Sequence, residues 1–186
     1  MPLSAEHKKL SCDSCHASWI PTCLGCHMSY DEKDKQWDHT LQALSPGAWH
    51  ERRWGSGTGP ATLGKSDANT IDVFLPGMIM SIDHPALNKT RYIRRFARIS
   101  PHTTGPGRSC VDCHRSPVSL GLGKGRLHET NGKLMFDPKM ESLIDGLPAD
   151  AWTSLEKPVV IPKENYPRPF VTREIEKIYK APNTEQ

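Results

Sequence analysis

All six cysteines of this 186-residue chain fall into three copies of one short pattern. Each copy reads Cys-x-x-Cys-His, and the copies occupy residues 12–16, 23–27 and 110–114. No cysteine stands outside a copy. A single copy has several possible uses, but three copies that account for every thiol indicate one chemistry repeated three times. Any fold of this chain has to accommodate that repetition.

The spacing within each copy is that of covalent haem attachment. Two thiols three residues apart can form thioethers with the two vinyl groups on one porphyrin edge, and the adjacent imidazole then lies beneath the ring centre and ligates the iron. The sequence therefore predicts three c-type haems. The predicted attachment residues are Cys12, Cys15, Cys23, Cys26, Cys110 and Cys113, and the predicted proximal ligands are His16, His27 and His114.

Two other uses of these cysteines remain open. Paired Cys-x-x-Cys motifs also build zinc sites, although zinc ribbons do not require a histidine directly after each pair. Three disulfides in a secreted scaffold would leave the histidines incidental. The histidine that follows every pair favours haem over both alternatives.

The composition also favours an interior that is filled by something other than side chains. Hydrophobic residues make up 36% of the chain, the mean hydropathy is −0.58, and there are 14 glycines and 16 prolines. Such a chain is short of apolar side chains for an ordinary core and short of long regular elements. Three porphyrins would supply the missing apolar surface.

Net charge argues against a nucleic-acid partner. The formal charge is +3, and a ferric haem with two ionised propionates carries about −1, so three haems would bring the total to about zero. No stretch approaches the roughly 18 consecutive apolar residues of a membrane span. The first ten residues are polar and show no signal peptide.

On its three motifs and its surplus of histidine, the chain resembles the multihaem c-type cytochromes. The resemblance implies an irregular fold with little regular secondary structure, short helices around the haems, a small β-rich insert, a hairpin and long loops. It also implies an extracytoplasmic location, in the periplasm, at the cell surface or secreted. Other cytochromes or redox proteins would be its partners, in an oligomer or filament.

The resemblance further implies a histidine as the sixth ligand of each iron, because a histidine just upstream of a motif often ligates a neighbouring haem in such proteins. His7, His39 and His102 are the predicted sixth ligands, with His84 in reserve. His50 and His128 are interpreted as surface or hairpin histidines. Ligation by Met78 or Met80, or by a residue of another chain, stays open.

The motifs suggest three regions. Residues 1–44 are predicted to form a dihaem module, with a turn between its two motifs, residues 45–109 a haem-free insert of loops and strands, and residues 110–186 the third haem with a C-terminal arm.

Local patterns predict individual elements of these regions. Strands are expected at 48–54, at 71–82 with a break at Pro76-Gly77, and at 91–99, with loops at 45–47 and 55–60. Asn131-Gly132 predicts a hairpin between 126–130 and 133–136. An extended arm is expected at 158–169, followed by a helix over 172–180 capped by Thr172. The basic segment 89–98 is interpreted as a partner for haem propionates or for an acidic redox protein.

These patterns together predict an electron-transfer protein that is not an enzyme, with closely spaced bis-histidine haems. The alternative is a subunit of a multihaem reductase of nitrogen or sulfur oxyanions, which would need one haem with an open distal face.

Overall fold

β-Strands dominate the computed structural model of the chain, which describes residues 7–75, 77–101, 103–156 and 167–181. The helical elements are short: η1 (His7–Lys9), α1 (Cys12–His16), α2 (Cys110–His114) and α3 (Thr172–Lys180). The strands are β1 (Ala17–Asp38), β2 (Ala43–Gly59), β3 (Thr62–Lys65), β4 (Ile71–Leu75), β5 (Gly77–Asp83), β6 (Arg91–Arg94), β7 (Ala97–Arg98), β8 (Thr103–Thr104), β9 (Gly125–Thr130) and β10 (Lys133–Pro138).

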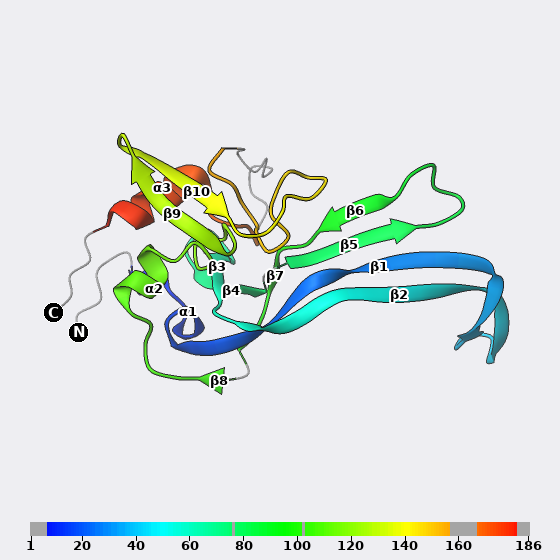
Figure 1. Ribbon diagram of the computed structural model, residues 1–186. Helices are drawn as coiled ribbons and strands as arrows, with labels where there is room; N and C mark the ends of the chain where they lie inside the picture. Colours follow the sequence, from blue (N-terminus) through cyan, green and yellow to red (C-terminus); the bar gives the residue numbers. More distant parts are fainter. Residues whose placement is uncertain (1–6, 76, 102, 157–166, 182–186) are drawn as a thin grey trace.

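A long antiparallel ribbon of β1 and β2 extends from one side of the molecule (Figure 1). Its ladder runs from the pair Ile20–Gly59 to the pair Asp38–Ala43. Strand β5 lies parallel to β1 beside Cys23–Ser29, and β6 pairs with β5. The order of this sheet is therefore β2-β1-β5-β6, and β8 pairs with the beginning of β1. From Tyr30 onward, β1 pairs only with β2 among the described residues, so this part of the ribbon has two strands.

A compact lobe at the other end of the molecule holds all the helices, the three-stranded sheet β3-β4-β7 and the hairpin β9-β10 (Figure 1). Its hydrophobic core joins the start of β1 to β3, β4, the 120–122 segment, β10 and α3. The buried core residues are Ala17, Ile20, Ala61, Leu63, Val73, Leu120, Leu122, Leu134, Phe170 and Ile175. The first and third motifs sit on this lobe, which gives them a packed base.

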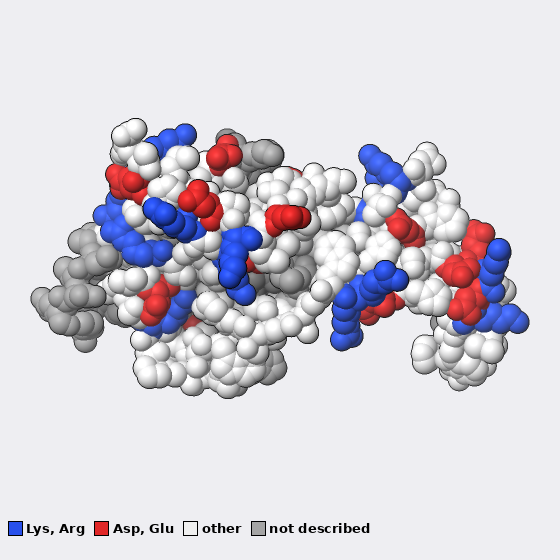
Figure 2. Space-filling model, in the orientation of Figure 1, with Lys and Arg blue, Asp and Glu red and all other residues white. Residues whose placement is uncertain are grey.

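Charged side chains do not segregate by sign. On the face shown in Figure 2, Lys and Arg are interspersed with Asp and Glu over the lobe and at the far end of the ribbon. No helix in the described part of the chain is long and apolar enough to cross a membrane.

The fold class expected from the sequence is wrong. The chain is a β-rich structure of three sheets with only short helices, rather than an irregular chain with helices arranged around haems. The predicted loops show the reason. The sequence predicts loops at 45–47 and 55–60, but residues 45–47 and 55–59 belong to strand β2. Cross-strand pairing with β1 holds these glycine-rich stretches extended despite their weak strand propensity.

Several local predictions are confirmed. β4 ends at Leu75 and β5 begins at Gly77, with Pro76 outside the described residues, and the hairpin forms around Asn131-Gly132. The helix over 172–180 is present, but Thr172 does not cap it: Val171 holds the cap position, and its N–H donates to Glu174 Oε2 at 3.0 Å. The strand expected at 91–99 is divided into β6 and β7. Residues 158–166 of the predicted arm lie outside the described residues.

The turn expected between the first two motifs is also wrong, because residues 17–22 begin β1. Pro21 is accommodated opposite Thr58 in the β1–β2 ladder.

Candidate functional site

The first motif forms a single helical turn, α1, which begins after Ser11. Ser11 has extended backbone angles, and its hydroxyl accepts the N–H of Ser14 at 3.2 Å. A helical turn places residues three and four apart on one face. Cys12, Cys15 and His16 are therefore presented together, which is the arrangement that attachment of one porphyrin edge requires.

Hydrogen bonds fix α1 to strand β4. The hydroxyl of Ser11 donates to Asp72 Oδ1 at 2.9 Å, and the hydroxyl of Ser14 donates to the carbonyl of Ile71 at 2.9 Å. Asp72 is buried, and its other carboxylate oxygen pairs with Arg98 Nε at 2.5 Å. The first motif is thus held on the sheet by a buried polar network rather than by apolar packing alone.

The third motif repeats the same conformation in α2. Here Ser109 is the cap: its hydroxyl accepts the N–H of Asp112 at 3.2 Å, and Asp112 Oδ2 accepts the N–H of Ser109 at 3.3 Å. These reciprocal bonds form a capping box. The Ser109 hydroxyl also lowers the pKa of Asp112 by hydrogen bonding to its carboxylate.

The segment 105–108 joins the two motif turns. The N–H of Arg108 donates to the carbonyl of Cys15 at 2.9 Å, and the N–H of Gly105 donates to the carbonyl of His16 at 2.8 Å. A Cβ at Gly107 would lie 3.3 Å from Cys15 Sγ, so the backbone passes directly over this thiol. The lobe therefore carries α1 and α2 side by side (Figure 1).

The thiols of the two motifs lie near enough to interact. Burial raises the pKa of the Cys113 thiol; the positive charge of Arg108 opposes this rise, and the neighbouring Cys15 adds to it. Cys12, Cys15, Cys110 and Cys113 are not joined in disulfides. Cys15 of the first motif is thus brought near Cys113 of the third, although the two are far apart in the sequence.

The ring of His16 is oriented through its Nδ1. This nitrogen lies 2.9 Å from the carbonyl of Gly105. Because a carbonyl can only accept, Nδ1 carries the proton, and the lone pair is left on Nε2. A backbone carbonyl on the second nitrogen is the usual support of a metal-ligating histidine.

His114, at the end of α2, faces His7 from η1. Their ring centroids are 5.9 Å apart and the rings are inclined by 70°. Burial lowers the pKa of His114, and the backbone of Ile178 partly opposes this shift. The Nδ1 atom of His114 is buried, and its contact with the Ile178 backbone falls short of a full hydrogen bond. The structure thereby brings together a predicted proximal ligand and a predicted sixth ligand.

The second motif is arranged differently. Residues 23–27 lie in β1, between β2 and β5, and not in a helical turn. The ring of His27 is held by two protein groups: Nδ1 lies 2.8 Å from Ser81 Oγ, and Nε2 lies 3.2 Å from Asp83 Oδ2. The side chain of Cys23 lies outside the described part. In this arrangement the second motif does not fit a haem.

The other histidines are placed as follows. His39, a predicted ligand, lies in the turn at the far end of the ribbon and away from both motif turns, and His102 lies outside the described residues. His50 pairs with Asp34 at 3.1 Å, and His128 Nδ1 lies 3.6 Å from Asp137 Oδ2.

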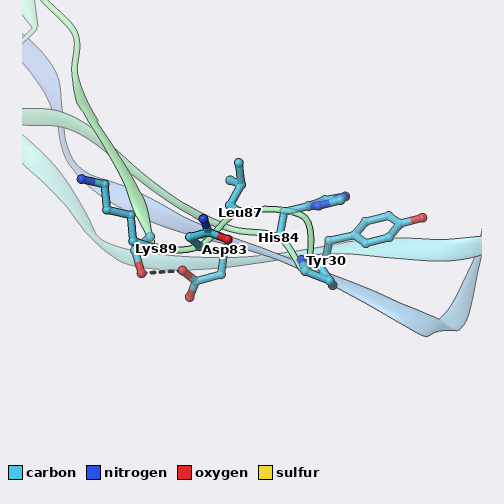
Figure 3. A pocket seen from close by; sticks show the side chains of 8 residues that line it. Tyr30, Asp83, His84, Leu87 and Lys89 are labelled. Atoms are coloured by element: carbon cyan, nitrogen blue, oxygen red, sulfur yellow. Dashed lines mark hydrogen bonds between the residues drawn. The ribbon is translucent and has the colours of Figure 1, made fainter.

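His84, the reserve candidate, belongs to a cluster of aromatic rings. Its ring stacks on Tyr30, with centroids 4.7 Å apart, and its centroid lies 5.6 Å from that of Trp49. His84, Tyr30 and the 83–90 segment line an open pocket, shown in Figure 3. Asp83 is shared between this pocket and the second motif, because it accepts from Thr90 Oγ1 and pairs with His27.

Two of the five basic residues in the segment 89–98 have structural roles. All the donor nitrogens of the Arg94 guanidinium bond to groups of the chain, including Asp145 Oδ2 at 2.7 Å and the carbonyl of Ala151 at 2.7 Å. Arg98 is held by Asp72. The hydrogen bonds and ion pairs of Arg94 and Arg98 are therefore made within the fold, and neither side chain is left to bind a haem propionate.

Sequence reasoning missed Gly105 and Arg108, which link the motif turns. Nothing in the composition of 105–108 distinguishes these residues. Their signal is positional only: they directly precede the third motif, and their contacts with the first appear only in three dimensions.

No family model, curated protein or solved structure matches the chain. The resemblance to the multihaem c-type cytochromes is corrected accordingly. The structure is β-rich, and its described residues contain no group of three or more His, Cys, Asp and Glu side chains that could hold a metal ion. Membership of that family is not supported.

The individual motifs can still be tested for their fit to a porphyrin. α1 and α2 fit, because each presents two thiols and an imidazole from one capped helical turn. The motif in β1 does not fit as it is arranged.

Proposed function

We propose that the chain binds haem covalently through its Cys-x-x-Cys-His motifs and transfers single electrons. The proposal depends on the chemistry of the motif, not on the overall fold. Cys12 and Cys15 would hold one porphyrin edge with His16 as the axial ligand, and Cys110 and Cys113 would hold another with His114.

One observation carries the proposal: two motifs far apart in the sequence both adopt a serine-capped helical turn, and the segment 105–108 links the two turns. The hydroxyls of Ser11 and Ser109 each accept the N–H three residues on. The backbone bond from Arg108 to Cys15 holds the turns together. A zinc or disulfide protein has no need for a histidine presented from the same turn as each thiol pair.

The chain's own residues prepare the axial positions. Gly105 fixes the tautomer of His16, which keeps the lone pair of Nε2 available. His7 stands across from His114 and would complete a bis-histidine pair. Haem supplies the one-electron couple, and two histidine ligands favour low potentials.

A third haem at residues 23–27 is supported by sequence alone. His27 would have to exchange its contacts with Ser81 and Asp83 for iron. For the whole protein we propose an extracytoplasmic location and redox proteins as partners, because covalent haem and single-electron chemistry require both an attachment pathway and a donor.

The test is to count covalent haems on the full chain produced with a haem-attachment system. Intact mass and the pyridine haemochrome spectrum give the number of haems in the wild-type chain and in three double variants: C12A/C15A, C23A/C26A and C110A/C113A. We expect C12A/C15A and C110A/C113A each to lose one haem. A third loss in C23A/C26A would extend the proposal to the β1 motif.

A wild-type chain without covalent haem would overturn the proposal. Stoichiometric zinc on such a chain would assign the cysteines to a structural metal, and intramolecular disulfides would assign them to a scaffold.

A further inference from the structure

We propose that Arg108 is a positioning residue shared by the two motif turns: its backbone and side chain fix their spacing, and its guanidinium supplies a positive charge beside α2 that favours the reduced iron there. This inference rests on the proposed function. It concerns a residue that lies outside both motifs and that contacts each of them.

The backbone of Arg108 contacts the first motif. Its N–H donates to the carbonyl of Cys15 at 2.9 Å, one residue before the axial His16. The preceding Gly107 passes over the Cys15 thiol so closely that a Cβ there would lie 3.3 Å from Sγ. The position of Arg108 is thus fixed relative to α1.

The side chain of Arg108 contacts the third motif. Its Nη2 donates to the carbonyl of Asp112 at 3.1 Å and to the hydroxyl of Ser119. Ser119 is fully buried and donates in turn to the same carbonyl at 2.6 Å. Nη1 reaches the carbonyl of Ala61 at 3.3 Å. The guanidinium therefore anchors α2 to the lobe while the backbone holds α1.

The acceptors of Arg108 are all neutral. Two are backbone carbonyls and one is a hydroxyl, and no ion pair among the described residues includes this side chain. The nearby Asp112 carboxylate is turned toward Ser109, from which it accepts two hydrogen bonds. The charge of Arg108 is therefore only partly compensated, and it lies beside α2.

An uncompensated positive charge destabilises ferric iron more than ferrous iron, because the ferric centre carries one more positive charge. Removing the charge should therefore lower the reduction potential of the haem held by α2.

The test compares three variants of the haem-loaded full chain in a spectroelectrochemical titration. R108Q removes the charge and R108K retains it. R95Q is the matched control, since Arg95 is an exposed arginine of the lobe–ribbon junction that precedes β7, and its loss changes the net charge equally. We expect the potential of one haem, the one held by α2, to become more negative in R108Q and to remain near wild type in R108K and R95Q.

The inference is overturned if R108Q shifts the potentials no more than R95Q, or if R108K shifts them as far as R108Q. If R108Q does not accumulate as folded protein, R108M, which also removes the charge, takes its place and is compared with R108K and R95Q by the same criterion. Absence of haem from the wild-type chain is a different result, which refutes the proposed function itself.

Discussion

The imidazole rings of His7 and His114 meet edge to face with their centroids 5.9 Å apart, although 107 positions separate the two residues in the sequence. Two axial ligands of one iron must come from separate segments that the fold brings to opposite sides of a plane. His7 lies on η1 and His114 ends α2, and both elements sit on the same lobe. This pair is the most direct link between the fold and the proposed chemistry.

Replacing His7 should open one iron. In H7A, we expect one haem to change from low spin to high spin and to bind carbon monoxide, while the others stay six-coordinate. The electronic spectrum of the reduced protein, with and without carbon monoxide, measures this change. H39A is the control, because His39 lies at the far end of the ribbon. A high-spin haem in H39A rather than in H7A would contradict the assignment.

Removing the cap of α1 should destabilise the lobe more than removing the cap of α2. S11A loses a cap bond worth about 1 kcal/mol, and it also deprives the buried Asp72 of a donor. S109A loses a cap bond at an exposed position only. We expect a loss of about 2 kcal/mol in S11A and about 1 kcal/mol in S109A. Urea unfolding of both variants gives the difference, and equal losses would show that the bond to Asp72 contributes nothing.

Local patterns in the sequence predict the elements that local physics determines. The Asn131-Gly132 turn and the helix over 172–180 require only short-range signals, and both are present. The ribbon was missed because its stability comes from cross-strand pairing between residues up to 39 positions apart, such as Ile20 and Gly59. Glycine-rich segments that read as loops became strands because a partner strand was available.

The features of the candidate site also divide into those that the sequence shows and those that depend on the fold. The motifs themselves are visible in the sequence, as is the histidine excess that includes His7. The contacts of Arg108 and Gly105 are not, because they depend on how two distant turns pack. The second motif does not form a helical turn for the same reason: the backbone of residues 23–27 pairs with the distant strands β2 and β5.

Acidification should weaken the attachment of α3. Burial raises the pKa of Glu174, but its hydrogen bonds with Arg168, Lys65 and the Val171 N–H lower it by more, from 4.5 to about 2. Both guanidinium nitrogens of Arg168 bind the carboxylate, at 2.8 and 2.9 Å. Because the folded pKa lies below the unfolded value, the stabilisation is complete above about pH 4.5 and is lost as the pH falls toward 2.

This loss should amount to about 3 kcal/mol at most, from the size of the shift. E174Q lacks the stabilisation at neutral pH, so its free energy of unfolding should fall less than that of the wild type between pH 5 and pH 2.5. Denaturant titrations at several pH values measure this. E176Q, on the same helix, is the charge-matched control and should keep the wild-type slope; parallel curves for E174Q and the wild type would refute the prediction.

Two glycines with positive φ should differ sharply in their tolerance of a side chain. Gly132 has φ +75° in the β9–β10 turn, and a Cβ there would meet nothing within 4 Å. Gly25 has φ +151° in β1, and a Cβ there would lie 2.4 Å from the carbonyl oxygen of Ile79 and 2.9 Å from its Cβ. Both substitutions strain the backbone, but only the second also forces two paired strands apart.

We therefore expect G132A to cost about 1 kcal/mol, which is the usual penalty for alanine at a left-handed position. G25A should cost about 3 kcal/mol or more, because backbone on β5 cannot move aside without breaking the β1–β5 ladder. Urea unfolding of the two variants provides the comparison. Similar losses in both would mean that β1 and β5 are not packed as closely at the second motif as the structure places them, and the objection to a haem at residues 23–27 would then lapse.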